Sequence, residues 1–189
     1  MPTNKTKILS KSRELFEQYG YQKTTLTDIA KSVGKVKTAI YYYFSGKEEI
    51  FAQIVQLEAE SFNKKLFTTV ETLKNPIQKL ELYVDTRMDL MQKLSNRYSF
   101  LKNDFFELMP IIEANRTESD LKEINYVKAI LEEINNESIQ IKNLDFSAKM
   151  LVNTLKGLEV QMYVTDQIII PKNETEKFRN FILYGILDK

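Results

Sequence analysis

The sequence predicts an all-helical protein of about nine helices, built from a small N-terminal head and a larger C-terminal body. Along most of the 189 residues, apolar side chains recur at intervals of three, four and seven, which is the period of an amphipathic helix. Capping residues, Gly and Pro separate these periodic stretches. We expect residues 1–47 to form one domain and residues 48–189 a second.

Three short helices are expected in the head. Periodic apolar residues predict the first over residues 5–19, with Gly20 ending it. Thr25 and Asp28 have the spacing of a capping box, which predicts a second helix that ends before Gly34. A third helix fits residues 37–44. Together these elements predict a helix-turn-helix arrangement.

The body begins with a long helix over residues 47–73, which we expect to be capped by Ser45 with Glu48 and to be the only rigid connection between head and body. Further helices are expected from Pro76, between residues 98 and 109, from Thr117 with Asp120, from residue 145 or 147, and from residues 173–176. Pro110 is expected to interrupt the chain between two of them.

Composition excludes several classes of protein. The chain has no Cys and no His, which removes disulfides, thiol chemistry and the commonest metal ligand and general base. It has neither a long uncharged apolar stretch nor an apolar leader, so we expect a cytoplasmic protein without membrane contact. Residues 1–47 carry nine Lys and Arg against three Asp and Glu, a net charge of +6, while the whole chain carries +1. A basic head on an acidic body indicates that the head meets a polyanion.

The third helix has two chemically different faces. Lys37, Thr38, Tyr41 and Tyr42 fall on one face, and Val36, Ile40, Tyr43 and Phe44 fall on the other, which we expect to point inward. Lys and Tyr can donate hydrogen bonds to phosphates, Lys reaches the acceptors of guanine, and Thr offers a hydroxyl and a methyl group. The outward face therefore suits the major groove of DNA. The alternative is that the four consecutive aromatic residues are core, but they cannot all point inward.

These residues carry a family resemblance. The segments Thr25-Leu26-Thr27-Asp28-Ile29-Ala30, Gly34, Ile40-Tyr41-Tyr42-Tyr43-Phe44 and Lys47-Glu48-Glu49-Ile50 resemble the TetR family of repressors over residues 5–55. The resemblance implies a homodimer whose recognition helices enter adjacent major grooves, and a C-terminal domain that binds an inducer. The chain departs from the family pattern at Lys35 and Val36, and Val is a poor helix N-cap.

The resemblance also implies roles for single residues. Thr25 and Lys47 would contact phosphates, while Lys37, Thr38 and Ala39 would face bases. Tyr41 and Tyr42 would lie on the backbone and flanking bases, and Lys35 would also face DNA. A two-fold dimer of this kind needs a palindromic operator of double-stranded DNA whose half-sites lie about 34 Å or a multiple of that apart.

Two apolar sets in the body are candidates for a ligand pocket and a dimer interface. Met and aromatic side chains adapt to varied ligand shapes, and the pocket candidates are Phe62, Met88, Met91, Phe105, Phe106 and Met109. The interface candidates form two stripes near the C-terminus: Leu151, Leu155, Leu158, Met162, Phe178, Phe181 and Ile182. Either set can equally be ordinary monomer core, and the sequence does not separate these cases.

The prediction from sequence is thus a repressor that a small apolar or amphipathic ligand releases from its operator, without cofactor or metal. One alternative is a DNA-binding protein of chromosome organisation that uses the same head. A helical enzyme is the other alternative, but no metal motif, phosphate-binding loop or nucleophile elbow is present.

Overall fold

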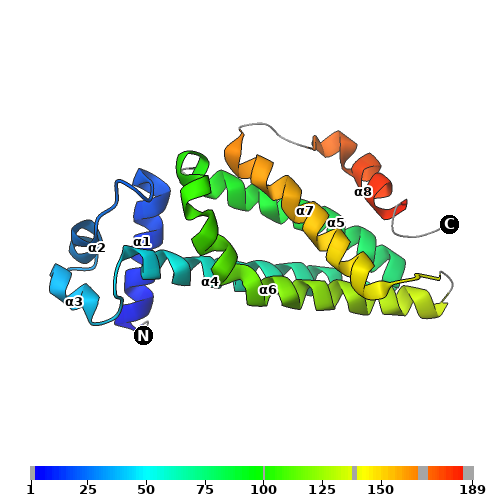
Figure 1. The fold of residues 1–189 in the computed structure, drawn as a ribbon, viewed down its shortest axis with the longest axis horizontal. Coiled ribbons are helices and arrows are strands. Elements are labelled where there is room, and N and C mark those ends of the chain that lie inside the picture. The colour runs from blue at the N-terminus through cyan, green and yellow to red at the C-terminus, as the bar shows by residue number, and fades with distance from the viewer. Residues whose placement is uncertain (1–2, 100, 138–139, 166–169, 185–189) are drawn as a thin grey trace. The chain divides into compact units, whose positions relative to one another are not determined.

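The computed structural model describes residues 3–99, 101–137, 140–165 and 170–184. Within these ranges the chain forms eight α-helices and one 3-10 turn, with no strand (Figure 1). The elements are α1 (Asn4–Tyr19), α2 (Leu26–Ser32), α3 (Lys37–Tyr41), α4 (Lys47–Val70), α5 (Pro76–Arg97), α6 (Leu101–Glu137), α7 (Leu144–Val164), η1 (Lys172–Glu174) and α8 (Thr175–Tyr184). The predicted all-helical class is confirmed. No helix in the described ranges is long and apolar enough to cross a membrane.

The expected interruption at Pro110 was wrong, because α6 continues through this residue. A proline inside a helix lacks an N–H donor and its ring crowds the carbonyl one turn earlier, at a cost of about 3 kcal/mol. Burial on both sides of the proline offsets this cost: Phe105 and Leu108 precede it, and Val127 and Leu131 follow it. Thr117 does not cap a new helix. Its hydroxyl donates to the carbonyl of Glu113 at 3.0 Å, inside α6.

The chain divides into two compact units that differ from the predicted domains. Unit 1 comprises residues 1–59 and 97–117, and unit 2 comprises residues 60–96 and 118–189. Both α4 and α6 therefore contribute residues to each unit. The expectation that the fourth helix alone connects head and body was wrong, since α6 is a second continuous helix shared by both.

Local sequence signals position the helices of unit 1. Gly20 ends α1 with a φ of +85°, and its N–H donates to the carbonyl of Phe16. Thr25 and Asp28 form the predicted capping box at the start of α2. The rings of Phe16, Tyr21 and Phe51 pack with centroids 5.1–5.9 Å apart, which joins α1 to the first turns of α4.

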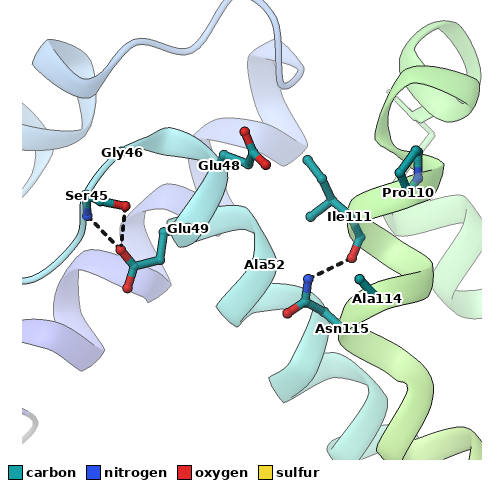
Figure 2. Close-up of a pocket in the computed structure, with 9 residues that line it drawn as sticks. All are labelled: Ser45, Gly46, Glu48, Glu49, Ala52, Pro110, Ile111, Ala114 and Asn115. Carbon is teal, nitrogen blue, oxygen red and sulfur yellow. Dashed lines mark hydrogen bonds between the residues drawn. The ribbon is translucent and has the colours of Figure 1, made fainter.

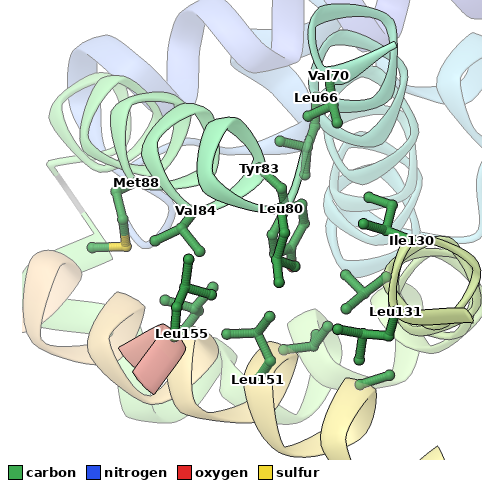
Figure 3. Packing of buried hydrophobic residues seen from close by; sticks show 14 of the residues in the cluster. Leu66, Val70, Leu80, Tyr83, Val84, Met88, Ile130, Leu131, Leu151 and Leu155 are labelled. Carbon is green, nitrogen blue, oxygen red and sulfur yellow. The ribbon is translucent and has the colours of Figure 1, made fainter. Parts of the chain in front are cut away.

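Unit 2 has its own apolar core, to which α4, α5, α6 and α7 contribute most residues and α8 contributes Leu183. Figure 3 shows side chains from α4, α5, α6 and α7 converging on one another. Leu66, Leu80, Leu131 and Leu155 are each fully buried there. Beside this core, Asn63 donates to the carbonyl of Ser119 at 2.7 Å, which joins α4 to α6.

Candidate nucleic-acid interface and the buried core of unit 2

The α2–turn–α3 segment holds α3 by a few specific contacts. Gly34 has a φ of +69°, a conformation that favours glycine. The N–H of Lys35 then donates to the carbonyl of Ala30 at 2.8 Å and ends α2. Ile40 and Phe44 are buried on the inner side of α3. These contacts fix which side of α3 faces outward.

The outward side of α3 carries the cations and phenols that the sequence predicted. Lys35, Lys37 and Thr38 are exposed, and Ala39 is half-buried. Tyr41 and Tyr42 are 50% and 84% exposed, so the aromatic run does not form core as a whole. A hydroxyl and a ring presented together to solvent suit contacts with phosphates and with the edges of bases.

Aromatic contacts support this face from behind. The ring of Tyr43 meets that of Tyr42 edge to face at 4.9 Å, and its hydroxyl accepts a hydrogen bond from the side-chain amide of Asn4 at 3.2 Å. Lys37 Nζ lies 5.8 Å from the centre of the Tyr41 ring. Tyr43 is half-buried and Phe44 is buried, which agrees with the inward face that the sequence predicted.

Val36 is not on the inner side, and that expectation was wrong. It is the N-cap residue of α3, with extended backbone (φ −90°, ψ 155°) and no side-chain capping hydrogen bond. Its side chain is 69% exposed. A residue that precedes a helix does not follow the 100° rotation of the helical residues, which is why helical periodicity misplaced it.

Two residues expected to contact phosphates have internal partners in this structure. The Thr25 hydroxyl donates to Asp28 Oδ2 at 2.6 Å and accepts from the Asp28 N–H. Lys47 Nζ donates to the carbonyl of Tyr21 at 2.8 Å and lies 4.1 Å from the centre of its ring. Burial lowers the pKa of Lys47, against the opposing effect of Asp104 and Glu107. Both side chains stabilise the head itself, and their contact with DNA stays a prediction.

Unit 1 also contains an open pocket of about 620 Å³ between the start of α4 and the middle of α6 (Figure 2). Its charged lining residues are Glu48 and Glu49. Glu49, rather than the expected Glu48, accepts hydrogen bonds from the N–H and hydroxyl of Ser45, at 2.6 and 2.8 Å. These bonds lower the pKa of Glu49. Carboxylates at this position repel phosphate.

The six predicted pocket residues fall into different compact units. Phe62, Met88 and Met91 belong to unit 2, where Met88 and Met91 are buried. The other three, Phe105, Phe106 and Met109, belong to unit 1. Phe106 is 74% exposed, whereas Phe105 is buried.

A buried ionic cluster that the sequence analysis missed lies in unit 2. Arg87 on α5 donates through Nε to Glu123 Oε1 on α6 at 2.7 Å, and its Nη2 forms an ion pair with Glu159 on α7. The Tyr83 hydroxyl donates to the same Glu123 oxygen at 2.6 Å. All four side chains are at most 4% exposed. Phe62 lies beside the cluster, with its ring centre 5.9 Å from the Arg87 guanidinium carbon.

Electrostatics keep Arg87 in its charged form and Tyr83 in its neutral form. Burial alone would lower the pKa of Arg87, but the carboxylates of Glu123 and Glu159 raise it well above its ordinary value. Burial and the charge of Glu123 raise the pKa of Tyr83, which therefore stays a neutral donor. Three buried ionisable side chains thus join α5, α6 and α7 by ion pairs beside the apolar core.

A sequence signal for the cluster exists in the helical spacing. Arg87 lies four residues after Tyr83, and Glu159 four residues after Leu155. Glu123 precedes Val127 by the same interval. On each of the three helices, one charged residue thus occupies a position on the apolar face. Charged residues at such positions indicate buried charges that pair with one another.

The predicted interface residues have unequal exposure. Leu151, Leu155 and Met162 are buried in the core of the single chain, and Leu158, Phe178 and Ile182 pack against that core. Phe181 on α8 is 78% exposed, and Phe146 and Met150 on α7 are 60% and 39% exposed. The exposed apolar surface of these helices thus lies largely at positions that the prediction did not include.

The exposed cationic face on α3, held by a capped α2 and a tight turn, defines a helix-turn-helix protein. Residues 8–54 match the family described as bacterial regulatory proteins, tetR family. The match covers the helix-turn-helix segment, where it agrees with the resemblance to the TetR family that the sequence indicated.

Curated relatives are similar to the chain over a segment of about the same length. The chain is 44% identical over 52 residues to the biofilm operon icaADBC negative transcriptional regulator IcaR of Staphylococcus epidermidis, and 46% identical over 52 residues to IcaR of Staphylococcus aureus. The match spans 28% of this chain and 28% of the length of either relative.

The fold is similar along nearly the whole chain to that of the fatty acid degradation regulator FadR from Bacillus halodurans, with a TM-score of 0.74, 17% identity, and 97% and 96% of the two chains covered. SmeT, the repressor of a Stenotrophomonas maltophilia multidrug efflux pump, has a TM-score of 0.72 at 18% identity, with 99% and 92% covered. At these identities the likeness concerns the fold.

Proposed function

We propose that this chain is a sequence-specific, DNA-binding transcription regulator that represses its target genes in the bacterial cytoplasm, where the DNA lies. One observation carries the proposal: the exposed face of α3 presents Lys37, Thr38, Tyr41 and Tyr42 together, on a head with a net charge of +6. The description of the IcaR relatives as negative regulators supports repression. The likeness to IcaR is confined to the head, so the regulated genes need not be similar.

The chemistry of the face supports binding in the major groove. Lys35 and Lys37 supply cations for guanine acceptors or phosphates, and Thr38 supplies a hydroxyl and a methyl group for bases. Tyr41 and Tyr42 donate to the phosphates that flank the contacted bases. In the same proposal Lys47 and Thr25 act mainly by holding the head in its binding shape, and Ala39 leaves room for the close approach of a base.

The functional form in this proposal is a homodimer on a palindromic operator. Exposed Phe181 on α8 and Phe146 on α7 offer apolar area for a two-fold interface, because one exposed aromatic face meets its own copy in such an interface. A Phe181→Glu variant should therefore dissociate more readily than the wild type in sedimentation equilibrium. A change at exposed Leu121 of α6, Leu121→Glu, is the matched control.

The regulatory signal in this proposal is a small apolar or amphipathic ligand of unit 2. Phe62, Met88 and Met91 supply apolar surface, and the Arg87 cluster supplies a polar group inside it. This combination is typical of small-molecule sites. A thermal-shift screen of small compounds, followed by operator affinity with each hit, tests the switch. Compounds that stabilise the protein but leave operator affinity unchanged would contradict the proposed ligand switch.

The DNA-binding proposal is tested with two substitutions on α3 and two controls. Operator DNA is first selected from random sequence with the full chain. Lys37→Ala and Tyr42→Ala should each weaken specific binding by about 1 to 3 kcal/mol. Lys64→Ala on α4 and Tyr19→Ala on α1 replace exposed residues of the same two types elsewhere and should leave affinity unchanged. Normal affinity in both α3 variants, with normal circular dichroism, would contradict the assignment.

Mapping of binding along the genome separates the two DNA-binding functions. A regulator should occupy a few discrete sites near promoters, whereas a protein of chromosome organisation should occupy many dispersed sites. The family membership of the head favours the first outcome.

A further inference from the structure

Neither the fold nor the electrostatics of the head explains the side chain of Val36 at the start of α3. It occupies the N-cap position, where Ser, Thr, Asp or Asn would accept a hydrogen bond from the first turn. Val36 makes no such bond. It is 69% exposed and so adds little to the core. The residue therefore contributes neither helix capping nor core packing to the isolated chain.

Its surroundings point to a target outside the chain. Val36 lies between Lys35 and Lys37, both exposed, and directly before Thr38. The N-terminal residues of a recognition helix are those that contact base edges in the major groove. The C5-methyl group of thymine is the one methyl group that the four bases present on those edges. It is therefore the base group with which an exposed isopropyl group at this position can bury the most apolar surface.

We propose that Val36 contacts a thymine methyl group in each half-site of the operator and thereby determines sequence specificity at that position. This inference rests on the proposed DNA-binding function. The contact removes about one methyl group and part of the isopropyl group from water. That burial corresponds to about a three- to fivefold gain in affinity per half-site, and to about ten- to twentyfold when both half-sites contribute.

The experiment replaces thymine with deoxyuridine, which lacks only the C5-methyl group. In the operator selected with the full chain, each thymine is replaced in turn, symmetrically in both half-sites, and affinity is measured at one fixed salt concentration. We expect one position at which deoxyuridine weakens wild-type binding by about ten- to twentyfold. Val36→Ala should bind the thymine and deoxyuridine operators with nearly equal affinity. Circular dichroism and melting temperature check that this exposed substitution leaves the fold intact.

Thr38→Ser is the matched control, because it removes the other methyl group in the same turn and keeps the hydroxyl. It should retain the deoxyuridine effect at the Val36 position. The inference is overturned if no position shows a deoxyuridine effect, if Val36→Ala keeps the full effect, or if Thr38→Ser alone abolishes it. Selection that enriches no sequence at all would instead refute the proposed function, so the two failures are distinguishable.

Discussion

Replacing Arg87 with Met should destabilise the protein by about 3 to 5 kcal/mol, because the change leaves two buried carboxylates without their cation. Glu123 and Glu159 are 2% and 3% exposed, so water cannot replace the guanidinium. The lost contacts are the 2.7 Å bond to Glu123 and the ion pair with Glu159. In a chain of this length, each kcal/mol lowers the melting temperature by roughly 2 to 4 °C. We therefore expect a decrease of about 6 to 20 °C.

Two further variants isolate the cause. Arg97→Met makes the same change at an arginine that is 46% exposed and paired with Glu17 and Glu58 at 4.0 and 3.7 Å, so the loss should be about 0 to 1 kcal/mol. Combining Arg87→Met with Glu123→Gln and Glu159→Met removes all three charges while keeping an acceptor for the Tyr83 hydroxyl. This triple variant should recover most of the stability. Urea unfolding at pH 7 measures all three. An Arg87→Met variant no less stable than Arg97→Met would refute the reasoning.

Three further predictions concern the head. Operator affinity should fall by roughly 10³ to 10⁵ between 50 and 200 mM salt if the dimer contacts about 6 to 10 phosphates; a flat salt dependence would count against the cationic face. Val36→Ser should raise the free energy of unfolding in urea by about 1 kcal/mol, because the serine hydroxyl can accept a hydrogen bond from the first turn of α3. No gain would contradict the expectation that the N–H groups of this turn lack a capping partner. Hydrogen bonds from Thr25 lower the pKa of Asp28, so this carboxylate stabilises the fold above its unfolded-state pKa and loses that contribution as pH falls through the lowered value. Asp28→Asn should thus be less stable than wild type at pH 7, with a difference that narrows on acidification; a widening difference would contradict the capping role.

The head could be predicted almost entirely from sequence, because its structure depends on local signals. Gly20 and Gly34 adopt the positive φ values that end α1 and α2. Thr25 and Asp28 form a capping box three residues apart, and such a pattern needs no knowledge of the rest of the fold. The outward face of α3 followed from helical rotation alone. The inward position predicted for Val36 was wrong, because Val36 precedes the helix and the helical rotation does not apply to it.

The body was harder to predict because distant contacts override local rules there. Pro110 disfavours a helix locally, yet α6 extends through it. Distant residues bond to α6 on both sides of the proline, as Gln22 does to Glu107 and Tyr83 does to Glu123. The Arg87 cluster joins residues that are 36 and 72 positions apart along the chain. Helical spacing can indicate that a charged residue lies on the buried face of its own helix. Which oppositely charged residue on another helix pairs with it is known only from the fold.

The continuity of α6 changes how a signal from unit 2 can reach the head. With a break at Pro110, α4 would be the single helix shared by the two units. In the structure, residues 101–117 of α6 belong to the same compact unit as Lys37 and Tyr42, and residues 118–137 belong to the unit that holds Glu123. A helix resists bending because its backbone hydrogen bonds and packed side chains move together. In the proposed function, a ligand that displaces α5 or α7 around the Arg87 cluster would act on α6 through Glu123, and α6 continues into the unit that contains Lys37 and Tyr42.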